Sequence, residues 1–254
     1  KLNAGKVYMR WRGLLAGYSK SLYDDDAASP YTIDGHGACA SGAHDNVTIS
    51  WTQPFGKHFA AGVGIELPKA SYTAPLPQGM DPEEAKKKVA SSFQTMPDMP
   101  MFVNYYSKHG HIRLSAVWRN LDYVDYSNDK HTAHSETGWG MKLSSKQKFG
   151  PVSLYGMVQY GVGIAGYFKD NDNAGLDLVP GDISQIITQG VKLVPTSSLG
   201  FMLGAQYNFT PKLFATGMFS FMRNYIPKYE IPSTTNWGDQ MRLGYSLNVN
   251  AVYR

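Results

Sequence analysis

The connections between the apolar stretches of this chain are alternately short and long. Segments in which every second residue is apolar are joined by short connections at 12–13, 53–57, 108–110, 146–151 and 210–212. Long connections separate them at about 20–45, 68–99, 122–135, 165–197 and 226–239. Antiparallel strands with tight turns at one rim and large loops at the other are typical of a transmembrane β-barrel of a bacterial outer membrane. The pattern therefore predicts an all-β, antiparallel barrel wall.

The last strand shows the alternation most clearly. Its apolar or aromatic set is Met241, Leu243, Tyr245, Leu247, Val249, Ala251 and Tyr253. The interleaved set is Arg242, Gly244, Ser246, Asn248, Asn250, Val252 and Arg254. A period of two gives a strand with one apolar and one polar face. Most strands of soluble proteins run only about 5–6 residues, so the length also favours a membrane strand.

Aromatic residues gather at both ends of the expected strands. Near the short connections lie Trp51, Phe55, Phe59, Tyr105, Phe149, Tyr207, Phe209, Phe214 and Tyr253. Near the long connections lie Tyr18, Trp118, Trp139, Tyr167, Tyr225 and Trp237. Two such belts are typical of the two interfaces of a membrane. The alternative is a soluble all-β protein or adhesin with aromatic pairs in its core.

Composition excludes several classes of protein. The 254 residues hold 24 Lys and Arg against 20 Asp and Glu, and a net charge of +4 argues against a dedicated nucleic-acid binder. One cysteine excludes an internal disulfide framework. No stretch reaches the roughly 18 apolar residues of a membrane helix. The chain starts at Lys1 without a signal peptide, so we expect a processed or truncated N-terminus.

The number of strands predicts an incomplete barrel. We expect eleven, at about 4–12, 14–19, 46–53, 58–67, 100–107, 111–121, 136–145, 152–164, 198–209, 213–225 and 240–254. Bacterial single-chain barrels have an even number of strands. We therefore expect residues 1–254 to form one barrel domain that is the C-terminal part of a longer barrel. A twelfth strand within 182–194 is the alternative, although a structured loop is favoured there.

A family resemblance supports this architecture. Residues 15–24 (LAGYSKSLYD), followed by 30–35 (PYTIDG) and preceded by 6–10 (KVYMR), resemble the DcaP-like family of outer-membrane porins. The resemblance implies a trimeric, sixteen-stranded channel in the outer membrane of a Gram-negative bacterium, which passes small anionic solutes such as dicarboxylates. The chain departs from the family pattern in the acidic run Asp24, Asp25 and Asp26 and in the Gly- and Ala-rich segment 35–42.

Every second residue of each expected strand points into the barrel, and these inward residues predict the charges of the lumen. The expected inward basic residues are Lys6, Arg10, Arg12, Arg113, Arg119, Lys142, Arg242 and Arg254, and the inward acids are Glu66 and Glu136. Rings of Arg and Lys are the usual device of anion-selective pores. This excess of cations predicts preference for small anions. The alternative for Arg12 and Arg254 is a place at the rim, against lipid headgroups or water.

The segment 20–45 is the best candidate for a constriction loop inside the channel. Its acids Asp24, Asp25, Asp26 and Asp34 would face the basic wall and create a transverse field. Two alternatives stay open, namely Ca²⁺ binding through these carboxylates and a solvated acidic loop. In the next long connection, residues 81–89 predict a short N-capped helix outside the barrel.

No catalytic or metal motif stands out. His131 and His134, or His36 and Cys39, have metal-ligand spacing but lack a third ligand. Ser135 beside His134 is the one candidate pair for an outer-membrane lipase or deacylase, without an evident acid. We therefore expect a non-enzymatic porin without a cofactor or bound metal. Its expected partners are outer-membrane lipid, small anionic solutes and two further copies of itself, with no nucleic acid.

Overall fold

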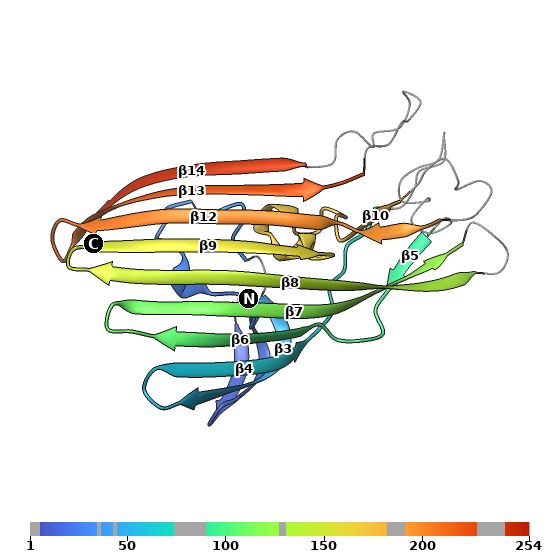
Figure 1. The fold of residues 1–254 in the computed structure, drawn as a ribbon, viewed down its shortest axis with the longest axis horizontal. Helices are drawn as coiled ribbons and strands as arrows, with labels where there is room; N and C mark the ends of the chain where they lie inside the picture. Colours follow the sequence, from blue (N-terminus) through green and yellow to red (C-terminus); the bar gives the residue numbers. More distant parts are fainter. Residues whose placement is uncertain are drawn as a thin grey trace, which may run out of the picture.

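A computed structural model of the chain describes residues 6–34, 37–42, 45–73, 90–126, 131–181, 191–227 and 242–253. These residues form one large, curved antiparallel sheet with short turns at one end and longer connections at the other (Figure 1). Its strands are β1 (Val7–Trp11), β2 (Leu14–Lys20), β3 (Asp45–Phe55), β4 (Phe59–Glu66), β5 (Ala90–Phe93), β6 (Met99–Tyr106), β7 (Gly110–Asp125), β8 (Thr132–Phe149), β9 (Val152–Val162), β12 (Ser197–Asn208), β13 (Leu213–Tyr225) and β14 (Leu243–Tyr253).

The order of the strands follows the order of the chain. The path β1-β2-β3-β4-β6-β7-β8-β9-β12-β13-β14 contains the eleven expected strands, and β5 pairs with the end of β7. The prediction of an antiparallel wall built from sequential hairpins is confirmed. β1 and β14 are the two edges of the described sheet, which is not closed.

Three details differ from the expectation or lie beyond it. The connection expected at 122–135 is shorter, because β7 continues to Asp125 and pairs with β8 from Thr132 onward. Within 182–194, the described part does not join the main sheet, since β11 (Leu193–Pro195) pairs with β10 (Leu178–Pro180). The helix expected at 81–89 lies outside the described residues.

The sheet is apolar on the outside and polar on the inside. On β14, Leu247 and Val249 are 72% and 78% exposed. The inward Ser220 of β13 and Gln159 of β9 are 0% and 1% exposed. A soluble sandwich would show the opposite distribution, because its apolar faces are buried against each other. Lipid contact for the apolar face, as predicted, explains the pattern.

Aromatic residues mark the height of this apolar face. Trp118 of β7 and Trp139 of β8 are cross-strand neighbours on the outer face. The next pair on this face, toward the long connections, is polar and consists of Asn120 and Thr137. Ten residues separate Trp139 from Phe149 at the other end of β8. At about 3.3 Å per residue and a tilt of about 40°, this corresponds to about 25 Å, the height of a barrel's apolar band. Within the described residues, no helix is long and apolar enough to cross a membrane.

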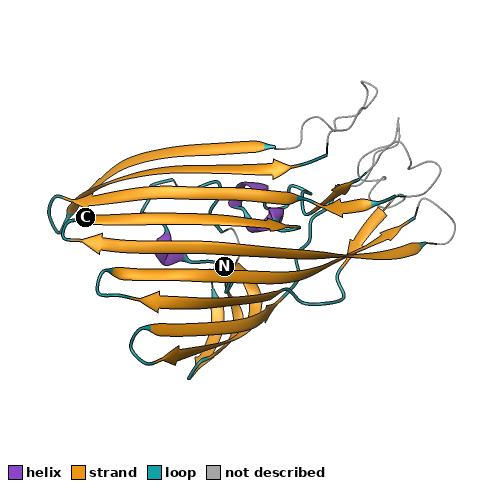
Figure 2. Cartoon of the chain, viewed as in Figure 1, coloured by secondary structure: helices purple, strands orange, loops and turns teal. Residues whose placement is uncertain are grey.

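The inner face is covered by chain from the long connections. The described helical segments are the short turns η1 (Asp26–Ala28), η2 (Ala165–Tyr167) and η3 (Lys169–Asn171), drawn in purple in Figure 2. A buried cluster joins these connections to the wall; it contains Tyr23, Ala38, Cys39, Ala40, Val117, Met157, Ile164, Tyr167, Phe168, Met202, Met218 and Met222. Glycine leaves the necessary room, since a Cβ at Gly200 would lie 2.5 Å from the Phe168 ring.

Candidate functional site: the interior of the sheet

Residues 21–34 and 37–42, together called the interior loop, cross the inner face of the sheet. Its backbone is held by side chains of the wall: Gln159 Nε2 donates to the Ala40 carbonyl at 2.8 Å, and Thr216 Oγ1 donates to the Tyr31 carbonyl at 2.8 Å. Ser220 Oγ accepts the Ala40 N–H at 3.0 Å. The loop thus lies where a constriction loop is expected, and its effect on permeation stays a prediction.

Two of the four loop acids bind basic or polar groups of the wall. Asp24 Oδ1 lies 2.6 Å from Lys142 Nζ, and both side chains are buried. Asp25 Oδ2 lies 2.8 Å from His111 Nε2 and accepts a hydrogen bond from Ser144 Oγ at 2.6 Å. Burial alone would raise the pKa of Asp25, but the hydrogen bonds from His111 and Ser144 outweigh it and lower the pKa below its ordinary value.

The other two loop acids are more exposed. The Asp26 side chain is 64% exposed, 3.7 Å from Lys20 Nζ, where solvent screens the pair. Asp34 is also exposed, and its backbone N–H donates to Thr32 Oγ1. Among the described residues there is no group of three acidic, His or Cys side chains that would hold a metal ion, so the structure gives no support for a Ca²⁺ site in this loop.

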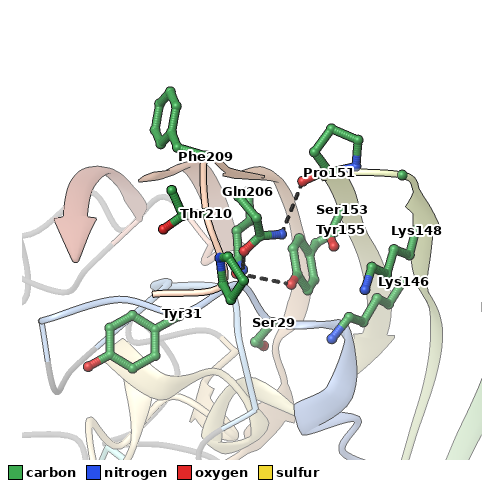
Figure 3. Close-up of a pocket in the computed structure, with 13 residues that line it drawn as sticks. Ser29, Tyr31, Lys146, Lys148, Pro151, Ser153, Tyr155, Gln206, Phe209 and Thr210 are labelled. Atoms are coloured by element: carbon green, nitrogen blue, oxygen red, sulfur yellow. Dashed lines mark hydrogen bonds between the residues drawn. The ribbon is translucent and has the colours of Figure 1, made fainter. Parts of the chain in front are cut away.

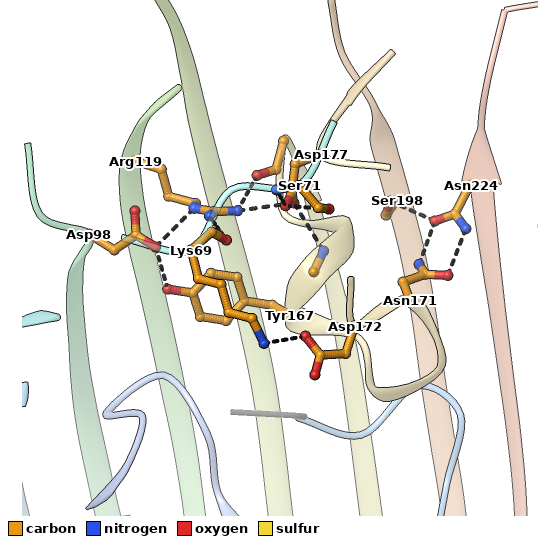
Figure 4. A network of polar contacts seen from close by, with 12 residues as sticks. Lys69, Ser71, Asp98, Arg119, Tyr167, Asn171, Asp172, Asp177, Ser198 and Asn224 are labelled. Carbon is orange, nitrogen blue, oxygen red and sulfur yellow. Dashed lines mark hydrogen bonds and ion pairs between the residues drawn. The ribbon is translucent and has the colours of Figure 1, made fainter. Parts of the chain in front are cut away.

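Arg119 is the centre of a buried ionic network (Figure 4). Its guanidinium lies 3.0 Å from Asp98 Oδ2 and 3.0 Å from Asp177 Oδ1. It also donates to the carbonyls of Gly163 and Lys69, both at 2.7 Å. These four hydrogen bonds reach the connection between β4 and β6 and the connection between β9 and β12, so one side chain ties both connections to the wall.

Two of the expected pore cations are therefore not exposed to solutes. Arg119 and Lys142 face inward, as their phase predicts, but they are 0% and 1% exposed because the connections cover them. Their charges are compensated by acidic residues of those connections. Glu66 is likewise inward and only 2% exposed, beneath the interior loop. The expectation that these three side chains line open water differs from the structure.

The remaining basic positions lie in several environments. Arg113 is half-buried, stacks on Phe102 with 3.8 Å to the ring centroid, and donates to the Leu22 carbonyl. Arg242 donates to the carbonyls of residues 226 and 227 at the end of β13. The exposed group comprises Lys6, Arg10 and Arg12, at β1 and its turn. Arg254 lies outside the described residues.

Two further lysines face the interior at the short-turn rim. Lys146 and Lys148 line a cavity of about 790 Å³ with Tyr155 and Gln206 (Figure 3). Within the described residues, neither lysine has an acidic partner, and Lys146 Nζ lies 5.2 Å from the Tyr155 ring. The sequence interpretation missed them because it placed 146–151 in a turn. They lie four and six residues after Lys142, and these even spacings are the signal that both lysines point to the same, inner face.

Lys108 adds a third lysine at this rim. With His109, His111, Lys146 and Lys148 it lines an adjoining cavity of about 600 Å³. In the described part of the chain, Lys108 forms no ion pair. We call Lys108, Lys146 and Lys148 the rim lysines.

The candidate hydrolase pair does not have the geometry of a nucleophile and its base. Successive residues of a strand point to opposite faces, so Ser135 and His134 of β8 diverge. Ser135 Oγ donates to Asn120 Oδ1 at 2.8 Å, whereas the His134 ring stacks on Tyr123 with 5.0 Å between centroids. The structure thus gives this alternative no support.

Comparison with known proteins supports the fold. No family model matches the sequence, and no curated protein matches it. Among solved structures, it is similar to the outer membrane channel DcaP of Acinetobacter baumannii, with a TM-score of 0.71 and 16% identity. The match covers 98% of this chain and 63% of the matched chain, so this chain spans less than two thirds of that channel's length. The resemblance noted in the sequence is thus confirmed at the level of the fold: the described residues form an open antiparallel sheet that matches part of the β-barrel of an outer membrane channel.

Proposed function

We propose that this chain forms the wall of a passive diffusion channel in the outer membrane of a Gram-negative bacterium. The observation that carries the proposal is the inverted polarity of the sheet, with exposed Leu and Val outside and buried Ser, Gln and Asn inside. A lipid-facing wall with a polar interior encloses a path for water and polar solutes. The fold shared with an outer membrane channel supports the same conclusion.

Small anions are the proposed preferred solutes. The two most deeply buried cations of the wall, Arg119 and Lys142, are paired with acids, so they contribute little net field to the lumen. The rim lysines lie at the cavities of the short-turn end and have no acidic partner among the described residues. Cations that line a low-dielectric opening concentrate anions near it and repel cations. Dicarboxylate-like solutes fit this charge, as the family resemblance implies.

Reversal potentials in planar bilayers with a KCl gradient test this proposal. The unchanged chain is expected to favour Cl⁻ over K⁺, and the double variant Lys146→Glu with Lys148→Glu is expected to shift the reversal potential toward K⁺. Lys212→Glu is the matched control, because Lys212 lies at the same rim and lines neither cavity. A K⁺-selective unchanged channel would refute the anion preference, and the absence of any conductance would refute the channel itself.

Assembly into a homotrimer is proposed on the family resemblance. Trimeric outer-membrane channels pack their apolar outer faces together over part of the wall. Chemical cross-linking of the protein in detergent, followed by denaturing gel electrophoresis, would give a ladder that ends at three chains. A ladder that ends at one or two chains would contradict the trimer.

A further inference from the structure

Glu66, at the end of β4, is a buried carboxylate that has no cationic partner among the residues that the structure describes. Its side chain faces the inner side of the sheet and is 2% exposed. Oε1 accepts the N–H of Leu22, at the start of the interior loop, at 2.7 Å. Oε2 is buried and has no hydrogen-bond partner in the described part of the structure. Glu66 therefore joins β4 to the interior loop through one oxygen and leaves the other unpaired.

The carboxylates that face Glu66 already use the nearby cations. Asp24 of the interior loop is paired with Lys142, and Asp98, which exchanges backbone hydrogen bonds with Glu66, is paired with Arg119. Asp24 Oδ2 and Asp98 Oδ1 are themselves buried and have no hydrogen-bond partner within the described ranges. An ionised Glu66 would thus be a third negative charge among two compensated ones.

Among the described residues, no other nearby group supplies the missing positive charge. Arg119 is shared with a second acid, Asp177. His111 is bonded to Asp25, and Arg113 interacts with Asp25 and donates to the Leu22 carbonyl. Tyr167 of η2 also faces Glu66, but its hydroxyl donates a hydrogen bond to Asp98 Oδ2. The buried groups around Glu66 therefore carry more acids than bases.

A buried, unpaired carboxylate is costly, and such a group takes up a proton rather than remain charged. We infer that Glu66 carries a proton while the interior loop is docked, and that loss of this proton releases the loop from the wall. The docked state then binds one more proton than the released state. By linkage, docking weakens as the pH rises, by up to a factor of about ten per pH unit.

The chain contains its own reporter of loop docking. Cys39 is the single cysteine of the chain, lies in the interior loop and is 1% exposed. Its thiol lies 3.3 Å from Ser220 Oγ on β13. A water-soluble methanethiosulfonate reagent can reach this thiol only when the loop leaves the wall. The rate of modification, divided by the rate for a cysteine peptide in the same buffer, measures the released fraction.

The experiment follows this normalised rate in the full chain, reconstituted in vesicles, from pH 6 to pH 9. The unchanged protein is expected to show a rise of about tenfold or more. Glu66→Gln keeps the shape of the side chain without the charge, and its normalised rate is expected to stay constant within about twofold over the same range. Glu136→Gln removes a carboxylate of β8 outside this cluster and is expected to keep the rise of the unchanged protein.

Two results would overturn the inference. One is a constant normalised rate in the unchanged protein, a measurement that needs no variant and therefore decides the matter even if Glu66→Gln fails to fold. The other is a rise in Glu66→Gln equal to that of the unchanged protein. Because thiol modification does not depend on conductance, a failure here is distinguishable from a failure of the proposed channel function.

Discussion

Replacement of Arg119 by Met tests whether a single side chain holds the interior loops to the wall. The guanidinium is fully buried and hydrogen-bonded to Asp98, Asp177 and the carbonyls of Gly163 and Lys69. Removal of one partner from a buried ion pair costs about 3–5 kcal/mol, because the remaining charge stays unpaired. Each orphaned carbonyl adds about 1–3 kcal/mol, although these contributions overlap. We expect a total loss of about 4–5 kcal/mol, limited by the free energy with which the loops dock.

Unfolding of the protein in lipid vesicles by guanidinium chloride, followed by tryptophan fluorescence, measures this loss of stability. The control variant combines Arg119→Met with Asp98→Asn and Asp177→Asn, which removes the orphaned charges. It is expected to recover about half of the loss or more, since a pair replaced on both sides is often nearly neutral. A loss below about 1 kcal/mol for Arg119→Met, or no recovery in the combined variant, would refute the reasoning.

Three further predictions concern the interior loop and the lipid face. The lowered pKa of Asp25 stabilises the docked loop at pH values above about 4, the ordinary pKa of the carboxyl, and this stabilisation is lost as the pH falls through the lowered pKa. Conductance should therefore stay constant from neutral pH to about pH 4 and rise at lower pH as the loop undocks. The variant Asp25→Asn should lack this rise. Val249→Arg should lower the free energy of unfolding by about 2–4 kcal/mol and Asn248→Arg by less than about 1, and equal losses would contradict the assigned lipid face. Lys142→Met should raise single-channel conductance by undocking the loop, while the addition of Asp24→Leu should reverse that rise; unchanged conductance in both variants would count against the buried pair.

The strands could be predicted from the sequence because one physical rule governs all of them. Lipid on one side and water on the other impose a period of two, which β12 shows clearly, whereas the pattern of β13 is ambiguous because Met218 and Met222 lie on its inner face. The tight turns were located for the same reason, since the pattern breaks there. The extension of β7 to Asp125 was missed because the outer face turns polar above Trp118, where the lipid no longer imposes the alternation.

Whether the inward charges are paired and buried or exposed to water could not be predicted from the strand pattern. The phase places Arg119 and Lys142 correctly on the inner face, yet their partners Asp177 and Asp24 are 58 and 118 residues away in the chain. Such pairings depend on how the long connections fold back, and no local pattern encodes that. Lys146 was missed for a different reason, because a residue near a turn was assigned to the turn rather than to the strand that precedes it.

The inverted polarity described above also bears on how this chain acquires its shape. A water-soluble protein gains most of its folding free energy by withdrawing apolar side chains from water into a core. In the sheet described here, residues such as Leu247 and Val249 are withdrawn from water only when acyl chains surround them. Insertion into the bilayer and completion of the hairpins are therefore expected to be one event. Before that event, the apolar side chains of the polypeptide are expected to need a carrier that shields them from water.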